Sequence, residues 1–401
     1  MTSSLEHVKG RPERRCDIDW LRALAMLTVL FFHCARFFDD DGWHAKSGEI
    51  SYGMTVFVAV VAQWLMPLFF VLSGMSACYA LDYLSGRGYL NARVKRLLVP
   101  LVVGVLTHVS LQVYIERATQ GGFSGSFFKF YPHYFDGFYA FGGNFAWMGL
   151  HLWYLEMLFI FSLITLPLFL WMRREKMKKS METFAGFLTK PGAIFLLGVP
   201  LGIVVSLVNM DPDGIGNRSF GGWALFPHLV FFVSGYVLTT DVRFRPALER
   251  HRVVALGLGI LATLFGFCLL EYGHYSLNSS GFSFLRAFNS WFWLIAILGF
   301  GSKHLNFNNR VLKYANEAVL PFYILHQSVI IVIGYFMIDW TASVMLQYLF
   351  LSATSFAVIM TIYELCVKRV NVMRFLFGMK LKRGRNNQLA SLSGASVVSQ
   401  R

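Results

Sequence analysis

The chain has 401 residues, of which 56% are hydrophobic and 17% aromatic, and it carries a formal net charge of +14. Apolar stretches of membrane-spanning length recur along the whole sequence, which excludes an ordinary soluble domain. The composition therefore predicts an all-α, polytopic integral membrane protein.

About ten stretches have the length and composition of transmembrane helices. They are centred near residues 18–37, 55–79, 97–115, 148–171, 191–209, 222–240, 253–271, 287–301, 317–338 and 343–365. No linker rich in proline, glycine or serine divides them, so we predict one membrane domain over residues 18–367. A basic N-terminus (1–17) precedes this domain, and a basic, partly disordered tail (368–401) follows it.

The distribution of basic residues predicts the topology. With the N-terminus in the cytoplasm, 29 of the 36 Lys and Arg residues fall in inner segments and 5 in outer loops. By the positive-inside rule, this bias predicts that both termini are cytoplasmic. The basic charge is thus explained by topology, and nucleic acid is not an expected partner.

Motifs for metal, nucleotide or serine-nucleophile chemistry are absent from the sequence. No two histidines have i,i+3 or i,i+4 spacing, and the five cysteines are scattered. There is no G-x-S-x-G elbow and no phosphate-binding P-loop. We therefore expect no metal site and no bound cofactor.

The first apolar stretch places a histidine near the middle of the membrane. His33 follows Arg22 by eleven residues, which is about three helical turns, so the two side chains share one face roughly 16 Å apart along the axis. A titratable group at that depth is costly in hydrocarbon and marks a candidate functional residue. The alternative is that Arg22 anchors the span and that His33 bonds a neighbouring helix.

This pattern suits acyl transfer from a thioester to a hydroxyl. The reaction needs a base for the hydroxyl and cationic groups for the phosphates of the donor. His33 suits the base, because an unperturbed imidazole titrates near pH 6.5. Arg22, Arg93 and Arg96 lie at the predicted cytoplasmic side, where acyl-coenzyme A would bind. The alternative is that Arg93 and Arg96 are only positive-inside anchors.

Other residues extend this candidate site. Glu156 lies deep in a predicted span and needs a partner there, so we expect Glu156, or one of the acidic residues 39–41, to orient His33. Twelve aromatic residues between Phe123 and Trp147 form either a segment in the membrane interface or a platform for sugar rings. The candidate acceptor-side residues are Trp43, His44, His151, Trp153 and His326.

These landmarks resemble the acyltransferase-3 family of integral membrane acyltransferases. In family order, between residue 17 and about residue 379, they are Arg22-x10-His33, Phe69-Phe70-x-x-Ser73-Gly74, Arg93-x-x-Arg96, His151-Leu152-Trp153-Tyr154-Leu155 and Tyr323-Ile324-Leu325-His326. Within the family, Trp43-His44 and Phe375-Leu376-Phe377-Gly378 are similar to the branch that adds succinyl groups to periplasmic glucans. The resemblance implies that Arg22 and His33 are essential and that Arg93 and Arg96 serve the acyl donor. We interpret Ser73 and Gly74 as close-packing residues.

We therefore predict a multi-pass O-acyltransferase of the bacterial inner membrane. It takes a succinyl or acetyl group from acyl-coenzyme A and transfers it to a hydroxyl of an extracytoplasmic glycan or glucan. We predict that His33, Arg22 and Glu156 are catalytic, with His33 as the general base. The alternative mechanism is a covalent relay in which a histidine carries the acyl group.

The sequence is also compatible with two other classes of function, a transporter and a structural protein. A transporter that exports an acylated sugar or lipid would be favoured by an inverted repeat with broken helices. An inactive structural partner of a glucan-synthesis complex would leave His33 and Glu156 unexplained. The oligomeric state is not predicted.

Overall fold

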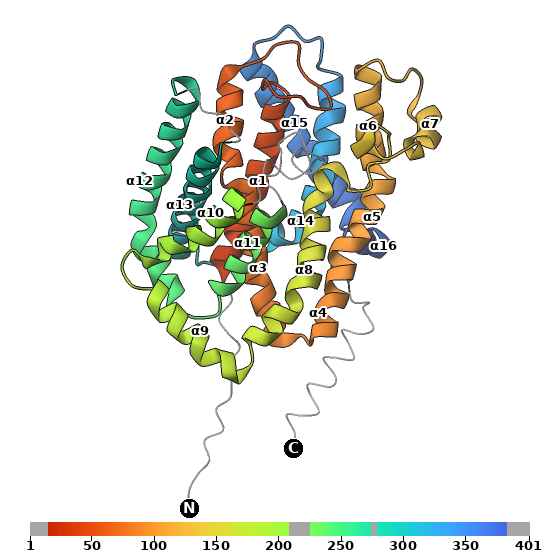
Figure 1. Cartoon of the computed structure of the whole chain (residues 1–401). Helices are drawn as coiled ribbons and strands as arrows, with labels where there is room; N and C mark the ends of the chain where they lie inside the picture. The colour runs from red at the N-terminus through yellow and green to blue at the C-terminus, as the bar shows by residue number, and fades with distance from the viewer. Residues whose placement is uncertain (1–14, 208–224, 274–278, 383–401) are drawn as a thin grey trace, which may run out of the picture.

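The computed structural model describes residues 15–207, 225–273 and 279–382 (Figure 1). Most of the predicted basic N-terminus and the end of the predicted tail lie outside the described residues. The described helices are α1 (Cys16–Arg36), α2 (Tyr52–Ala62), α3 (Leu65–Tyr83), α4 (Gly86–Arg93), α5 (Val99–Leu106), α6 (His108–Thr119), α7 (Phe127–Phe130), α8 (Trp153–Met172), α9 (Glu175–Leu188), α10 (Gly198–Leu207), α11 (Leu225–Val237), α12 (Phe244–Glu271), α13 (Ser280–His304), α14 (Arg310–Tyr335), α15 (Val344–Ile362) and α16 (Asn371–Leu376).

The helices confirm an all-α, polytopic membrane protein. Within the described ranges, eight helical segments are long and apolar enough to cross a membrane. A ninth is counted if α9 and the following segment Ala193–Leu207 form one span, although they meet at a bend of 119°. The predicted span at 222–240 contains α11, an apolar helix of only 13 residues in its described part.

The bend before α10 has a local cause that can be read in the sequence. Pro191 and Gly192 interrupt the apolar pattern, and Gly192 has a φ of +79°, a left-handed conformation that favours glycine. The backbone N–H of Gly192 donates to Nε2 of His251 on α12 at 2.9 Å. The predicted span at 191–209 therefore begins at this bend, and its segment Ala193–Leu207 is one arm of the bent pair that it forms with α9.

Helix α14 lies at the centre of the bundle, and α12 lies at its edge (Figure 1). The most apolar part of α14 is 67% buried, against 17% for α12. α14 packs against α1, α6 and α15, whereas α12 packs mainly on α13. α12 is the more apolar of the two helices, as is expected of a helix exposed to lipid, whereas polar residues of α14, such as His326, are enclosed by protein.

Helices α3 and α11 approach each other through a reciprocal pair of glycines. A Cβ on Gly74 would lie 1.9 Å from the carbonyl oxygen of Phe232, and a Cβ on Gly235 would lie 2.0 Å from that of Val71. Small residues at such crossings let backbones come close in a membrane. The interpretation of Gly74 as a close-packing residue is confirmed.

The two ends of the bundle differ in composition. The basic end, which contains α4 and α9, lies at the bottom of Figure 1 and carries the basic segments at residues 85–96 and 172–190. The loop end lies at the top and contains residues 37–51 and the segment between α6 and α8. The positive-inside rule assigns the basic end to the cytoplasm, and this orientation stays a prediction.

Candidate active site

The site is centred on two histidines that face each other from α1 and α14. The ring centroids of His33 and His326 are 5.0 Å apart. Nδ1 of His326 lies 2.6 Å from the carbonyl oxygen of Tyr323, so Nδ1 carries the proton and Nε2 keeps a lone pair. Nε2 of His326 and Nδ1 of His33 are both buried and have no hydrogen-bond partner among the described residues. Two imidazoles with available nitrogens therefore meet inside the bundle.

His151 lies against this pair, but both of its ring nitrogens are hydrogen-bonded. Its ring centroid is 5.2 Å from that of His326. Nε2 donates to the carbonyl oxygen of Ile324 at 3.0 Å, and Nδ1 accepts from the Gln112 amide at 3.0 Å. The hydroxyl of Tyr323 donates to the carbonyl of His151. His151 is thus neutral and ties the start of α8 to α14.

Gln112 on α6 extends this network. Its amide nitrogen also donates to the hydroxyl of Ser328 at 2.6 Å, and its carbonyl accepts from Gln327 at 3.2 Å. Ser328 in turn donates to the carbonyl of His108. These bonds join α6 and α14 through buried side chains, so the position of His326 is determined by three helices.

A further carboxylate, Glu116, bonds His44 beside the histidine pair, and it was not among the predicted site residues. Glu116 accepts a hydrogen bond from Nδ1 of His44 and another from the hydroxyl of Tyr139 at 2.8 Å. The indole of Trp43 lies between: its centroid is 6.0 Å from that of His44 and 6.1 Å from that of His33. A signal was present in the sequence, because residues 108, 112 and 116 have i,i+4 spacing and share one helix face.

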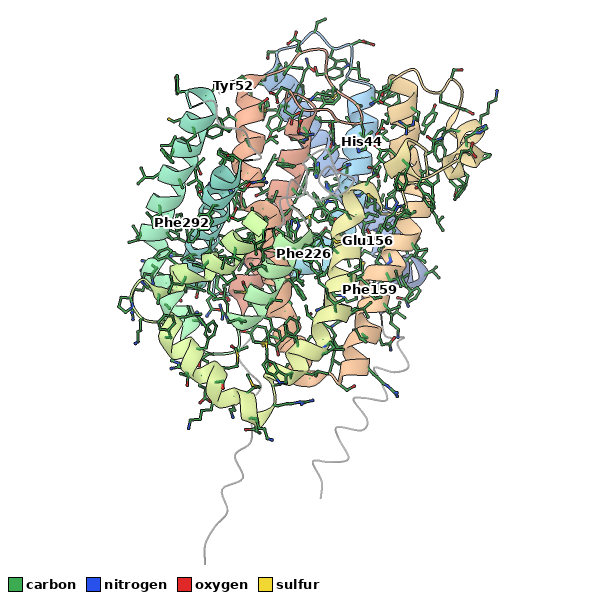
Figure 2. The ribbon with its side chains drawn as sticks, viewed as in Figure 1. His44, Tyr52, Glu156, Phe159, Phe226 and Phe292 are labelled. Carbon is green, nitrogen blue, oxygen red and sulfur yellow. The ribbon has the colours of Figure 1, made fainter. Side chains whose placement is uncertain are left out.

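The structure does not join the other acidic candidates to His33. Glu156 lies at mid-depth on α8 (Figure 2), where its Oε2 is buried without a hydrogen-bond partner among the described residues. Asp39 binds Arg36 at 2.5 Å and Lys46 at 2.7 Å. Burial raises the pKa of the Asp39 carboxyl, although both cations oppose this shift. Asp39 therefore orders the loop rather than His33.

Three arginines lie close together at the basic end of the bundle: Arg22 on α1, Arg93 at the end of α4 and Arg96 in the turn that follows it. The guanidinium of Arg22 donates to the hydroxyl of Ser76 at 2.7 Å and pairs with Asp19 at 3.3 Å. Arg96 lies close enough to Arg93 and Arg22 for their charges to repel one another. The exposed side chain of Arg96 has no ion pair or hydrogen bond among the described residues. The structure thus brings together the three residues that we assigned to the donor.

The backbone at Arg96 has an unusual conformation with a clear cause. Residues Val94–Leu98 form a π-helical turn between α4 and α5. Pro100 follows and has no N–H to donate to the carbonyl of Arg96 four residues earlier. The C-terminal segment packs at this carbonyl, since a Cβ on Gly378 would lie 2.8 Å from it. Such wide turns occur frequently at functional sites.

The remaining candidates lie outside the histidine pair. Trp153 packs on His228, with ring centroids 5.2 Å apart, and not on His33. In the aromatic segment, Tyr134 is buried and donates to the carbonyl of Val105 at 3.0 Å, whereas Phe128 is 84% exposed. The described residues contain no cluster of three His, Cys, Asp or Glu side chains that could hold a metal ion.

Known proteins resemble the chain over most of its length. The acyltransferase domain model matches residues 17–364. The Glucans biosynthesis protein C of Salmonella heidelberg (strain SL476) is 23% identical over 385 residues, which cover 92% of this chain and 95% of that protein. Its namesake from Salmonella typhi is 22% identical over 384 residues, with the same coverage. No solved structure matches the chain. Because the family match spans most of its length, the chain belongs to the acyltransferase-3 family and is a multi-pass membrane acyltransferase.

Proposed function

We propose that the protein transfers an acyl group, succinyl or acetyl, from acyl-coenzyme A to a hydroxyl of a glucan on the other side of the bacterial inner membrane. The glucan is inferred from the names of the relatives, which are 22–23% identical to this chain. The donor binds from the basic end and the acceptor from the loop end.

Three cations support the binding of the donor at the basic end. Arg96 is exposed and unpaired among the described residues, Arg93 rests on the ring of Tyr89 at 4.7 Å, and Arg22 is bound by Ser76. Guanidinium groups recognise phosphate oxygens well, because their planar donors fit two oxygens at once. The phosphates of coenzyme A would therefore occupy the space that these arginines face.

The chemistry is assigned to His33. Its ring nitrogen takes the proton of the acceptor hydroxyl as the oxygen attacks the carbonyl carbon of the thioester, so that the C–O bond forms and the C–S bond breaks. The thiolate of coenzyme A leaves and is protonated. His326, whose Nε2 lone pair faces the same space, is positioned to share the proton of the His33 imidazolium.

One observation carries this proposal. The unpartnered nitrogen of His33 belongs to the face of α1 that ends at the arginine group, roughly 16 Å away along the axis, and the unpartnered nitrogen of His326 lies on the facing helix α14. That separation matches an arm that carries a thioester from a phosphate site into the membrane. A purely structural histidine pair would be expected to use its nitrogens in hydrogen bonds, as His151 does.

The test uses the full-length protein in proteoliposomes, with labelled succinyl- or acetyl-coenzyme A on the side of the basic end and glucan on the other side. We expect label on the glucan with wild-type protein and none with His33→Ala. Labelled sugar that crosses the membrane while the thioester stays intact would overturn the proposal in favour of transport.

A further inference from the structure

We propose that a pocket at the loop end, beside Trp43 and His44, is the subsite that binds a neutral sugar ring of the acceptor, and that Glu116 positions His44 in it. This inference rests on the proposed function, because it assigns the acceptor's place. It adds a residue, Glu116, and a ligand class to that function.

The pocket has the size and lining of a small-molecule site. Its volume is about 420 Å³, within the usual range of about 300–1,000 Å³. Its wall includes Trp43, His44, Lys46, Thr119, Gln120 and Tyr335. The lining combines the aromatic rings of Trp43 and Tyr335 with the hydrogen-bonding groups of Thr119 and Gln120, so the apolar face of a sugar ring could stack while its hydroxyls bond. His44 lies at the loop end of the bundle in Figure 2.

The charges of the wall favour a neutral ligand over an anion. The ammonium of Lys46 is occupied: it binds the Asp39 carboxylate at 2.7 Å and the carbonyls of Arg36 and Asp41 at 3.2 and 2.8 Å. The Glu116 carboxylate lies directly behind His44. An anion entering here would meet no free cation among the described lining residues, whereas a polyol needs none.

Glu116 determines which nitrogen of His44 faces the pocket as an acceptor. The side chains of His44 and Glu116 are 11% and 8% exposed, and the carboxylate accepts a hydrogen bond from the Nδ1–H of the imidazole. Nε2 then carries a lone pair and has no other partner among the described residues. A carboxylate behind a histidine is a common means of fixing both its tautomer and its orientation. A sugar hydroxyl can therefore donate to Nε2.

This subsite adjoins the reacting histidine. Trp43 lines the pocket and is nearly parallel to the ring of His33, with 19° between the planes. The same indole lies beside both imidazoles, with ring centroids 6.0 Å from His44 and 6.1 Å from His33. A sugar bound at His44 would thus hold its neighbouring hydroxyls beside Trp43, at the entrance to His33.

The test measures binding separately from transfer. Cellohexaose and maltohexaose, which are neutral glucan probes, are titrated against the full-length protein in detergent by calorimetry, and the KM values for glucan and acyl-coenzyme A are measured in proteoliposomes. The variants are Glu116→Gln, Trp43→Ala and the conservative Trp43→Phe. The control is Asp136→Asn, because Asp136 makes the same kind of bond to His133 at 2.9 Å but both side chains are more than half exposed.

We expect Glu116→Gln to raise the probe Kd and the glucan KM about 10-fold, since removing a carboxylate behind a histidine typically costs about 10–100-fold. The KM for acyl-coenzyme A should stay within about 2-fold, and Asp136→Asn should match wild type. Trp43→Ala should weaken probe binding by about 10-fold, and Trp43→Phe should restore part of it, as a stacking role requires. A merely structural role of Glu116 would move both KM values together and would overturn the assignment.

The outcomes separate this inference from the proposed function. Glucan transfer that proceeds with an unchanged glucan KM in Glu116→Gln and Trp43→Ala would overturn the subsite and leave acyl transfer standing. Probe binding that is weakened by these variants, in a protein that never acylates glucan, would support the subsite and refute glucan as the acyl acceptor. His33→Ala should still bind the probes like wild type.

Discussion

His151 and His326 lie with their ring centroids 5.2 Å apart, yet their nitrogens meet different surroundings. Both ring nitrogens of His151 are hydrogen-bonded, to Gln112 and to Ile324. In His326, by contrast, Nδ1 bonds the carbonyl of Tyr323 on the same helix, and Nε2 has no partner among the described residues. Because a buried polar atom without a partner costs free energy, such atoms persist where function requires them. The difference supports the proposal that His33 and His326 face the reactants, whereas His151 builds the site.

A similar contrast exists among the arginines at the basic end. Arg22 is held by Ser76 and Asp19, whereas Arg96 is exposed and without an ion pair among the described residues. A group whose donors are already used orients the site, and a group whose donors are free can bind a ligand. The contrast between side chains with free and with occupied hydrogen-bonding groups therefore predicts which substitutions reduce acyl transfer most.

The largest effect is expected for His33→Ala. The change should lower kcat about 10³-fold, because a positioned general base contributes about 10²–10⁴-fold. The KM for acyl-coenzyme A should change little, since the arginines remain in place. Transfer is measured in proteoliposomes with His133→Ala, an exposed histidine, as the control. Activity near wild type in purified, folded His33→Ala would show that His33 is not the base and that an unpartnered nitrogen does not identify a reacting histidine.

A smaller loss, about 10²-fold in kcat, is expected for His326→Gln. Its Nε2 faces His33, so both residues serve the same proton transfer. The double variant with His33→Ala should then be no slower than His33→Ala alone, because residues that act as a unit are not additive. Steady-state kinetics of the three variants check this. Losses that multiply would show that the two histidines act in separate steps.

Arg96→Ala should raise the KM for acyl-coenzyme A about 10-fold, as expected when a charge-assisted bond worth about 1.5–3 kcal/mol is removed. The matched control is Arg87→Ala, because Arg87 is also exposed at the basic end but lies outside the arginine group. Equal effects of both variants on KM would indicate that only the general positive charge of this end matters.

The sequence predicted the spacing of residues along each helix well, but not the depth of each side chain or the contacts between helices: His33, expected near the middle of its span, lies in the last turn of α1. Helical periodicity placed Arg22 and His33 on one face, and the structure keeps them there in the single helix α1. Contacts between distant segments were out of reach: His44 meets Glu116 at 72 residues' separation, and His151 meets Ile324 at 173. The position of a residue along a helix follows from counting, but its depth depends on where the helix ends, and the direction of its side chain depends on which helices pack beside it. For the same reason Glu156, at a suitable depth, lies away from His33.

The turn at Pro191 and Gly192 illustrates a second limit. Its residues are typical of a chain reversal, and the apolar residues that follow are typical of a span. Both patterns are real, and the structure satisfies them together through a bend of 119°. Counting apolar stretches cannot reveal such a bend, because hydropathy carries no information on the angle between consecutive helices.

The smallest effect on activity is expected for His151→Phe, which should lower transfer only a few-fold but destabilise the fold. The change removes one of the two hydrogen bonds donated by the Gln112 amide and the bond to the Ile324 carbonyl, and such a loss in a buried site typically costs about 1–3 kcal/mol. His251→Phe is the matched control, because His251 also uses both nitrogens, on Ala247 and Gly192, but lies at the bend before α10. Thermal unfolding in detergent should show a similar loss for both variants, with activity unchanged in His251→Phe. Since Ile324 precedes His326 by two residues, only the loss at His151 shifts a reacting histidine. A fall in kcat at His151 as large as that at His33 would mean that a hydrogen-bonded histidine reacts, and the distinction between open and occupied nitrogens would fail.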